Sequence, residues 1–292
     1  MIDLHTHSTA SDGMLTPGEL VHYATEKKLK VLALTDHDTT DGLAEAQQQA
    51  HALGITFVPG IEINIAWPTG EFHLLGLGLK KVSQELRNII DFLKEGRLQR
   101  NLQMVEKLQQ AGVDITMEEL QQRFNANTLG RPHFAQLLVE KGIVKVRQQA
   151  FDRFFAKGRP CFVDREGAAL HDAVKAIKSS GGIPVQAHPL SMYVSWGKLE
   201  DKIIEIQQSG VQGLEAWHPG ARVAEAERLE EMAHKLGMIA TAGSDFHGVK
   251  VRADRHIGET AGAKKIDDRY WEEELKPALL RLHGDDDLTF RE

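Results

Sequence analysis

Short apolar segments alternate with amphipathic segments along most of this chain. Runs with the composition of β-strands occur at residues 2–4, 31–35, 55–58, 61–65, 72–79, 183–187, 211–217 and 238–242. Apolar residues at helical spacing lie between them, at 17–28, up to Leu53, and at 170–180, 199–208 and 223–236. This alternation predicts an α/β fold built on parallel strands. Pro59 and Gly60 predict an interruption between the third and fourth runs.

The stretch from Ser83 to about Gly158 differs, because only helical spacing occurs in it. Between Lys94 and Arg165, 13 Lys/Arg stand against 8 Asp/Glu, a local charge of +5 that leaves −12 on the rest of the chain. We therefore predict a barrel domain formed by residues 1–96 and 160–292, and a basic all-helical insertion domain, residues 97–159, that acts as a substrate lid. Scattered charges on a solvated helical face are the alternative explanation.

The composition is that of an ordinary globular protein, with 41% hydrophobic and 26% charged residues among 292. The net charge of −7 argues against a protein that coats nucleic acid. No apolar run reaches the roughly 18 residues that a membrane helix needs, and the chain start lacks a secretion signal, so we expect a cytoplasmic protein with no membrane partner. The single Cys161 leaves nitrogen and oxygen donors for any metal site.

Nearly every strand-like run carries a His, Asp or Glu at or near one end. In chain order these residues are His5, His7, Asp12, His37, Glu62, His73, His188, His218, Asp245 and His247. Because parallel strands of a closed α/β barrel end at one face, we expect these side chains to meet there. Each residue taken alone could have an ordinary structural role, such as that of a hydrogen-bonded histidine in the core. A shared set of metal ions explains all of them together, since buried charges are costly without partners.

The first two histidines show how far one motif carries this argument. Strand alternation places the imidazoles of His5 and His7 on one face, where they could hold one metal ion. Asp12 follows after a short turn and could add a carboxylate. A histidine pair at a chain start also occurs by chance or in an expression tag, and a metal site needs three or more ligands. The pair therefore gains its meaning from the rest of the chain.

Six motifs, in this order, resemble those of the polymerase-and-histidinol-phosphatase (PHP) superfamily. They are His5-x-His7 with Asp12-Gly13, Leu34-Thr35-Asp36-His37-Asp38, Gly60-Ile61-Glu62, Phe72-His73, Ala187-His188-Pro189 and Gly243-Ser244-Asp245-Phe246-His247. The resemblance covers essentially the whole chain. The segments from Glu95 to Arg100 and from Arg131 to Ala135 resemble the subgroup of nucleoside 3′,5′-bisphosphate phosphatases and RNase AM-like 5′-to-3′ exoribonucleases.

The resemblance implies a distorted (β/α)7 barrel, similar to a TIM barrel, with a trinuclear metal site that hydrolyses phosphoesters. The ligands it implies are His5, His7, Asp12, His37, Glu62, His73, His188, Asp245 and His247. Glu62 is the expected bridging carboxylate, and the expected catalytic residues are Asp12, His37, Glu62, His188 and Asp245. We expect up to three divalent ions, with Mn first and Fe or Zn as alternatives, and a metal-bridging hydroxide that attacks phosphorus.

Positive and imidazole side chains outside the ligand set are candidates to bind the substrate. Arg100, Arg131, His133 and Arg159 of the insertion could bind a second phosphate, and His218 could contact phosphate. Each of the four in the insertion could equally be an exposed helix charge. The expected partner is a small phosphorylated nucleotide or a short RNA end, with no obligate protein partner.

We therefore expect a metal-dependent phosphoesterase, a hydrolase that acts on nucleotides. It would remove the 3′-phosphate of 3′,5′-bisphosphate nucleotides, trim 5′-phosphorylated short RNA from 5′ to 3′, or do both. Two alternatives stay open. A histidinol-phosphate phosphatase would share the metal core but needs no basic lid. A non-catalytic metal-binding PHP module tends to lose ligands, whereas all nine ligand positions are filled here.

Overall fold

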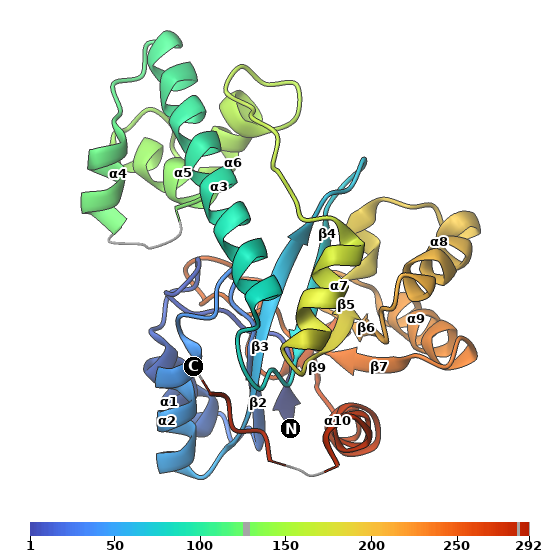
Figure 1. The fold of residues 1–292 in the computed structure, drawn as a ribbon. Coiled ribbons are helices and arrows are strands. Elements are labelled where there is room, and N and C mark those ends of the chain that lie inside the picture. The colour runs from blue at the N-terminus through green and yellow to red at the C-terminus, as the bar shows by residue number, and fades with distance from the viewer. Residues whose placement is uncertain (125–128, 285–286, 292) are drawn as a thin grey trace. The chain divides into compact units, whose positions relative to one another are not determined.

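The chain folds into two compact units (Figure 1). The computed structural model describes residues 1–124, 129–284 and 287–291. The barrel unit comprises Met1–Ile90 and Gly167–Glu292, and the helical unit comprises Asp91–Glu166. Helix α3, Gln84–Gln110, contributes residues to both. Within the described residues, no helix is both long and apolar enough to cross a membrane.

A sheet of seven strands in sequence order forms the barrel unit. The strands are β1 (Ile2–Asp3), β2 (Val31–Leu34), β3 (Thr56–Ile65), β4 (Phe72–Leu77), β5 (Ile183–Gln186), β6 (Gly213–Trp217) and β7 (Ile239–Ala242). The first and last strands meet: the Asp245 N–H donates to the His5 carbonyl oxygen at 2.9 Å, and Thr6 pairs with Phe246 in parallel. The predicted distorted seven-stranded barrel is confirmed.

The expectation that all strands run parallel is wrong for β4. This strand is antiparallel to both of its neighbours, β3 and β5. The other neighbouring strands are parallel: β1 to β2, β2 to β3, β5 to β6 and β6 to β7. Only a short connection, residues 66–71, joins β3 to β4, and a connection of this length permits a hairpin but no parallel crossover. His73 therefore enters the site from the start of its strand, paired with Asn64 near the end of β3.

The predicted interruption at Pro59 and Gly60 is also wrong, because β3 runs without a break from Thr56 to Ile65. Pro59 lacks an N–H, but its carbonyl oxygen accepts from the N–H groups of Gly78 and Leu79 at 2.8 and 2.9 Å. A Cβ atom at Gly60 would lie 2.8 Å from Thr35 Cγ2. Glycine at this position lets neighbouring strands approach closely.

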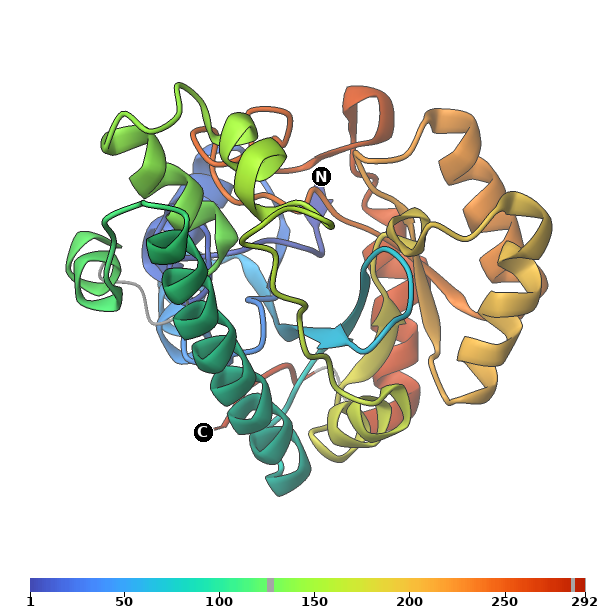
Figure 2. The ribbon, with the colours of Figure 1, turned by 90° about the horizontal axis from the view of Figure 1, so that it is seen from above.

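Helices cover the outer side of the barrel. The helices of this unit are α1 (Pro17–Glu26), α2 (Leu43–Leu53), α7 (Leu170–Ser179), α8 (Trp196–Gln208), α9 (Val223–Lys235) and α10 (Lys276–His283). Helices α8 and α9 lie outside strands β5 to β7 (Figures 1 and 2). In α7 the buried residues Ala173, Val174, Ala176 and Ile177 recur at helical spacing and form one apolar face toward the sheet.

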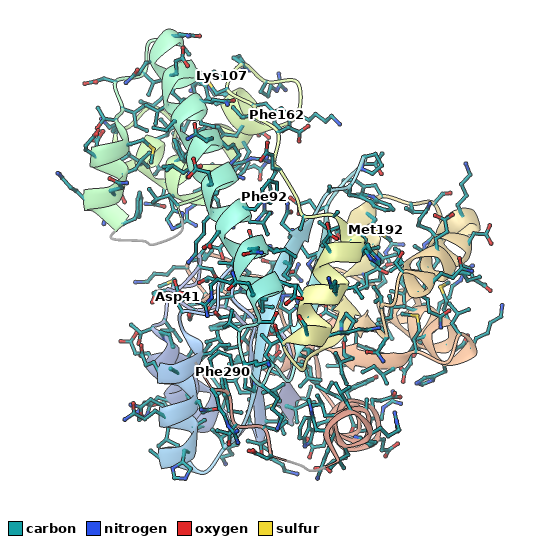
Figure 3. The ribbon with its side chains drawn as sticks, viewed as in Figure 1. Asp41, Phe92, Lys107, Phe162, Met192 and Phe290 are labelled. Atoms are coloured by element: carbon teal, nitrogen blue, oxygen red, sulfur yellow. The ribbon has the colours of Figure 1, made fainter. Side chains whose placement is uncertain are left out.

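Shorter elements complete the barrel unit. They are the 3-10 turns Pro189–Met192 and Ala261–Ala263, the strands β8 (Glu259–Thr260) and β9 (Lys264–Lys265), and the π-helical segment Tyr270–Leu275. The end of the chain returns to α2, where Phe290 exchanges two hydrogen bonds with the Gln47 side chain, at 2.7 and 3.1 Å (Figure 3).

The helical unit has its own hydrophobic core. Its helices after α3 are α4 (Met117–Phe124), α5 (Arg131–Glu140) and α6 (Arg147–Ala150), and α6 continues as the π-helical turn Phe151–Phe155. Phe134, Leu138 and Phe155 are fully buried among apolar neighbours, and Cys161 is buried with them. A separate core of this kind is what makes a segment a compact unit.

Candidate metal centre

The histidine pair that follows β1 lies at the closure of the barrel. Because Thr6 pairs with Phe246, the residues on either side of it point to the same face, and His5 and His7 are both fully buried there. Their Nε2 atoms are 3.1 Å apart. Two imidazole nitrogens that converge on one point are suited to share a metal ion.

Glu62, on β3, lies at the centre of the cluster and is fully buried. Five imidazoles surround it: Oε1 lies 2.9 Å from both His73 Nδ1 and His188 Nε2, and Oε2 lies 2.8, 3.3 and 3.4 Å from His37 Nδ1, His7 Nε2 and His5 Nε2. Burial acts to raise the pKa of Glu62, but the imidazoles outweigh it and hold the pKa well below its usual value. The carboxylate is therefore ionised and central enough to bridge ions.

Asp245 lies just after β7, in the segment that pairs with the segment carrying His5 and His7. Its Oδ1 lies 3.3 Å from His7 Nε2, 3.7 Å from His5 Nε2 and 3.4 Å from His247 Nδ1. Burial acts to raise the pKa of Asp245, but the surrounding imidazoles, His247 foremost, hold it well below the usual range. Asp245 has a φ of +54°, a strained conformation for a non-glycine residue that is common at functional sites.

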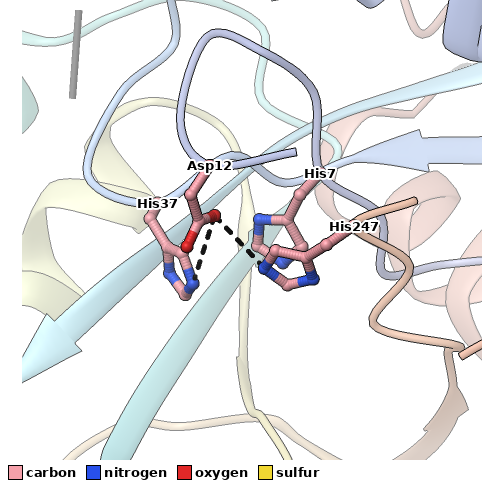
Figure 4. A group of neighbouring side chains, drawn as sticks. All are labelled: His7, Asp12, His37 and His247. Atoms are coloured by element: carbon pink, nitrogen blue, oxygen red, sulfur yellow. Dashed lines mark ion pairs between the residues drawn. The ribbon is translucent and has the colours of Figure 1, made fainter. Parts of the chain in front are cut away.

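Asp12 joins two further imidazoles at the edge of the cluster (Figure 4). Its Oδ1 lies 3.2 Å from His247 Nε2 and 4.0 Å from His37 Nε2, and the rings of His7 and His247 stack with centroids 4.0 Å apart. Burial acts against the charge on His247, but Asp12 and Asp245 raise its pKa to about 9. Burial, with His247 and His37 nearby, lowers the pKa of His7 to about 3, so His7 is a neutral donor.

Two buried carboxylates that are not ligand candidates hold these segments in place. Asp36 accepts hydrogen bonds from the Ser8 N–H at 2.8 Å, the Ser8 hydroxyl at 2.6 Å and the Ser11 hydroxyl, which fixes the turn that carries Asp12. Glu215, on β6, contacts His5 Nδ1 at 2.9 Å and accepts a hydrogen bond from the backbone N–H of His188 at 2.8 Å. A carboxylate on Nδ1 leaves Nε2 for a metal.

The donor set fits divalent metal ions. Four overlapping groups have ligand atoms within 4.8 Å of one another: His7, Asp12, His37 and His247; His5, His7 and Asp245; His5, Glu62 and His188; and His37, Glu62 and His73. Buried Asp12 Oδ1, His37 Nδ1 and Glu62 Oε2 make close ion-pair contacts, but none of these atoms forms a hydrogen bond of suitable geometry with a described residue. Buried ligand atoms that make no hydrogen bond are available to bind metal ions.

The nine implied ligands thus lie together, and four of the predicted substrate-binding residues belong to the other compact unit. Arg100, Arg131, His133 and Arg159 belong to the helical unit. There Arg131 stacks 5.2 Å from the Phe162 ring (Phe162 is labelled in Figure 3) and donates to the Val163 carbonyl oxygen. His133 Nδ1 accepts the Gly130 N–H at 3.0 Å.

His218 lies beside the cluster. Its Nε2 is 3.3 Å from Asp245 Oδ2, and its Nδ1 accepts the Gly220 N–H at 3.0 Å, so the ring is neutral with the proton on Nε2. Burial lowers its pKa, in agreement with this state.

Sequence reasoning missed the supporting carboxylates. Asp36 lies within the Leu34–Asp38 motif and Glu215 within a strand-like run, but the sequence alone predicts no role for either. The one available signal was a single Glu within the apolar run 211–217, a position where a charge needs a buried partner.

Comparisons with known proteins agree with this fold and site. A family model described as PHP domain matches residues 3–154. The chain is 35% identical over 281 residues to a 3′,5′-nucleoside bisphosphate phosphatase of Chromobacterium violaceum, a match that covers 96% of this chain and 98% of that protein. It is 34% identical to a 5′-3′ exoribonuclease of Haemophilus influenzae, with 84% and 89% covered.

A solved structure from Bifidobacterium adolescentis, a candidate metal-dependent phosphoesterase, superimposes with a TM-score of 0.84 at 28% identity, and covers 97% of this chain and 96% of its own. The chain belongs to the PHP domain family. The resemblance predicted from the six motifs is confirmed.

Proposed function

We propose that this protein is a metal-dependent hydrolase that cleaves phosphoesters of nucleotides. The observation that carries the proposal is the convergence of nine His, Asp and Glu side chains on one end of the barrel, with ligand atoms within 4.8 Å of one another in four overlapping groups. The relatives support it, since one is named a nucleoside bisphosphate phosphatase and another an exoribonuclease.

The donor atoms suit up to three ions, of which Mn is the first choice and Fe or Zn the alternatives. Imidazole nitrogens and carboxylate oxygens without thiolates favour these metals. Glu62 would bridge ions, because both of its oxygens face imidazoles that belong to different groups. When bound, the ions would activate water and neutralise phosphate oxygens.

The protein's own groups would prepare this chemistry. Among the proposed catalytic residues, Asp12, His37, Glu62, His188 and Asp245, the three carboxylates are held ionised by neighbouring imidazoles. Asp12 and Glu62 each offer a buried oxygen that has no hydrogen-bond partner among the described residues. His218 would contact phosphate next to Asp245. A general acid for the leaving group is not needed if a metal stabilises the departing oxygen.

The helical unit would contribute to substrate binding through its positive groups, Arg100, Arg131, His133 and Arg159. In this proposal the insertion, residues 97–159, serves as a lid over bound nucleotide. Arg159 has an exposed side chain, whereas Arg131 is already engaged by Phe162 and Val163. We propose that the protein functions in a reducing compartment such as the cytoplasm, and its single cysteine, which is free and buried, supports this location.

A phosphate-release panel tests the proposed function. Purified protein is freed of metal, reloaded with Mn and offered adenosine 3′,5′-bisphosphate, a 5′-phosphorylated short RNA and histidinol phosphate. We expect release of the 3′-phosphate, of mononucleotides from RNA, or of both, and no comparable turnover of histidinol phosphate. Failure on both nucleotide substrates would refute the proposal, and turnover of histidinol phosphate alone would replace it.

A further inference from the structure

Two arginines beside the candidate metal centre have no role in the account so far. Arg252 and Arg255 lie in the loop that follows His247. Arg255 is buried, with 5% of its surface exposed. Within residues 1–124, 129–284 and 287–291, its guanidinium forms no hydrogen bond, and its Nε is enclosed without a partner. The nearest carboxylate, on Asp254, is 3.6 Å away and mostly exposed.

The Arg255 guanidinium lies against the turn that carries His218. A Cβ atom placed on Gly220 would lie 3.6 Å from Arg255 Nη2 and 2.9 Å from His218 Nδ1, so the glycine separates the two side chains. Burial lowers the pKa of Arg255, although Asp245 acts in the opposite direction. Arginine stays charged even so, and a buried charge without hydrogen bonds is costly unless a ligand supplies them.

Asp245 lies between Arg252 and the metal-binding atoms. Its Oδ1 faces His5, His7 and His247, whereas its Oδ2 faces His218 at 3.3 Å and Arg252 Nη1 at 4.0 Å. An anion held by the arginines would therefore lie across the carboxylate from the ions. It would not occupy the position of the phosphate that the ions activate.

We propose that Arg255, assisted by Arg252, binds the phosphate of a doubly phosphorylated nucleotide that is not hydrolysed. The inference rests on the proposed function and names the part of the substrate that this side of the barrel recognises. A phosphate offers several acceptor oxygens to the planar donor fork of arginine, which would give the Arg255 guanidinium the hydrogen bonds that it lacks among the described residues. The barrel unit would then contribute, beside the positive groups of the helical unit, to distinguishing substrates with two phosphates from those with one.

The test compares Arg255→Met with wild type on adenosine 3′,5′-bisphosphate and on adenosine 3′-monophosphate, both with Mn-loaded protein. We expect the loss of kcat/KM on the bisphosphate to exceed the loss on the monophosphate by at least about tenfold, the effect of losing charged hydrogen bonds. Arg255→Lys, which keeps the charge without the fork, should recover part of the difference. Equal losses on both substrates, or no loss on either, would overturn the inference.

Direct binding separates this inference from the proposed function. Calorimetry measures adenosine 5′-monophosphate binding to Mn-loaded wild type, Arg255→Met and Arg228→Met; the last removes the same charge from an exposed position on α9. We expect about tenfold weaker binding only for Arg255→Met, with metal content and melting temperature retained. If wild type hydrolyses neither nucleotide, the proposed function fails, and the binding measurements alone then test the role of Arg255. Wild type that binds no more tightly than Arg255→Met would then overturn the inference.

Discussion

Glu215 connects two segments that carry metal-ligand candidates, one after β1 and one after β5. It contacts His5 Nδ1 at 2.9 Å and accepts a hydrogen bond from the backbone N–H of His188 at 2.8 Å. Burial acts against the charge on His5, but Glu215 and Glu62 raise its pKa well above the usual value. A histidine in such a pair is oriented and made a better donor through its other nitrogen.

We therefore expect Glu215→Gln to weaken metal binding by about 10- to 100-fold while the barrel stays folded. Titration calorimetry of metal-free protein with Mn measures this. Glu230→Gln is the matched control: Glu230 is buried too, but it accepts from Trp217 Nε1 and Tyr270 rather than from a ligand. The control should lower the melting temperature and leave metal affinity in place. Equal metal affinities in wild type and Glu215→Gln would contradict the assigned role.

The raised pKa of His247 gives metal binding a pH dependence. In the metal-free protein this pKa is about 9, because Asp12 and Asp245 outweigh burial, so His247 is protonated at pH 7. A metal needs the neutral ring, and binding must therefore release a proton, with affinity falling up to about tenfold per pH unit below 9. Calorimetry in buffers of different ionisation enthalpy counts the protons. No release at pH 7 would contradict this assignment.

The raised pKa of His247 also determines how the stability of the metal-free protein changes with pH. A histidine whose folded pKa is raised contributes stability that is complete below about pH 6.5 and is lost as the pH rises through about 9. The metal-free protein should therefore lose this contribution between these values, and Asp12→Asn should reduce the loss. Thermal melts across that range measure it.

The ligand candidates could be predicted from the sequence because most of them lie at or near the end of an apolar run, where a charged or imidazole side chain is conspicuous. Glu215 and Arg255 could not be assigned in this way. Their partners, His5 and the turn at Gly220, are 210 and 35 positions away, and only the closed barrel brings them near. A lone Glu in a strand or a lone Arg in a loop has many ordinary explanations.

At the scale of elements, the positions of the strands were predictable, whereas the antiparallel direction of β4 was not. Apolar runs identify strands, but the direction of β4 depends on the short β3–β4 connection, which cannot make a parallel crossover. Pro59 and Gly60 were expected to break the strand. They lie within it, and the missing side chain of Gly60 permits the close approach of Thr35.

Gly243, which follows β7, tests how tightly the barrel closure holds the site. A Cβ atom there would lie 2.2 Å from His5 Cβ and 2.7 Å from Glu215 Oε1. We expect Gly243→Ala to cost about 1–3 kcal/mol in the free energy of unfolding and to weaken Mn binding, since His5 and Glu215 must separate. Denaturant unfolding and Mn titration check both effects.

The control is Gly197→Ala, in α8, where an added Cβ meets nothing within 4 Å. It should leave metal binding unchanged and raise stability slightly. Retained Mn affinity in Gly243→Ala would show that the closure does not position His5.

At the scale of the whole molecule, a barrel unit with the ligand cluster is combined with a helical unit that has a separate core. The change from alternating to purely helical spacing near Ser83 is the sequence signal that predicts an insertion. In the proposed function, the positive charge of the stretch 94–165 is the reason for assigning it to the binding of an acidic substrate. The metal cluster within the barrel unit remains the feature on which the whole account depends.

The most direct measurement is the metal content of Mn-reconstituted wild type and of Glu62→Gln, by elemental analysis after gel filtration. The account predicts more than one ion per chain in wild type. It predicts fewer in the variant, with a wild-type circular dichroism spectrum and no release of phosphate from adenosine 3′,5′-bisphosphate, because Glu62 faces five imidazoles. One ion or none in wild type, or equal metal content in the two proteins, would contradict a multinuclear centre built around Glu62.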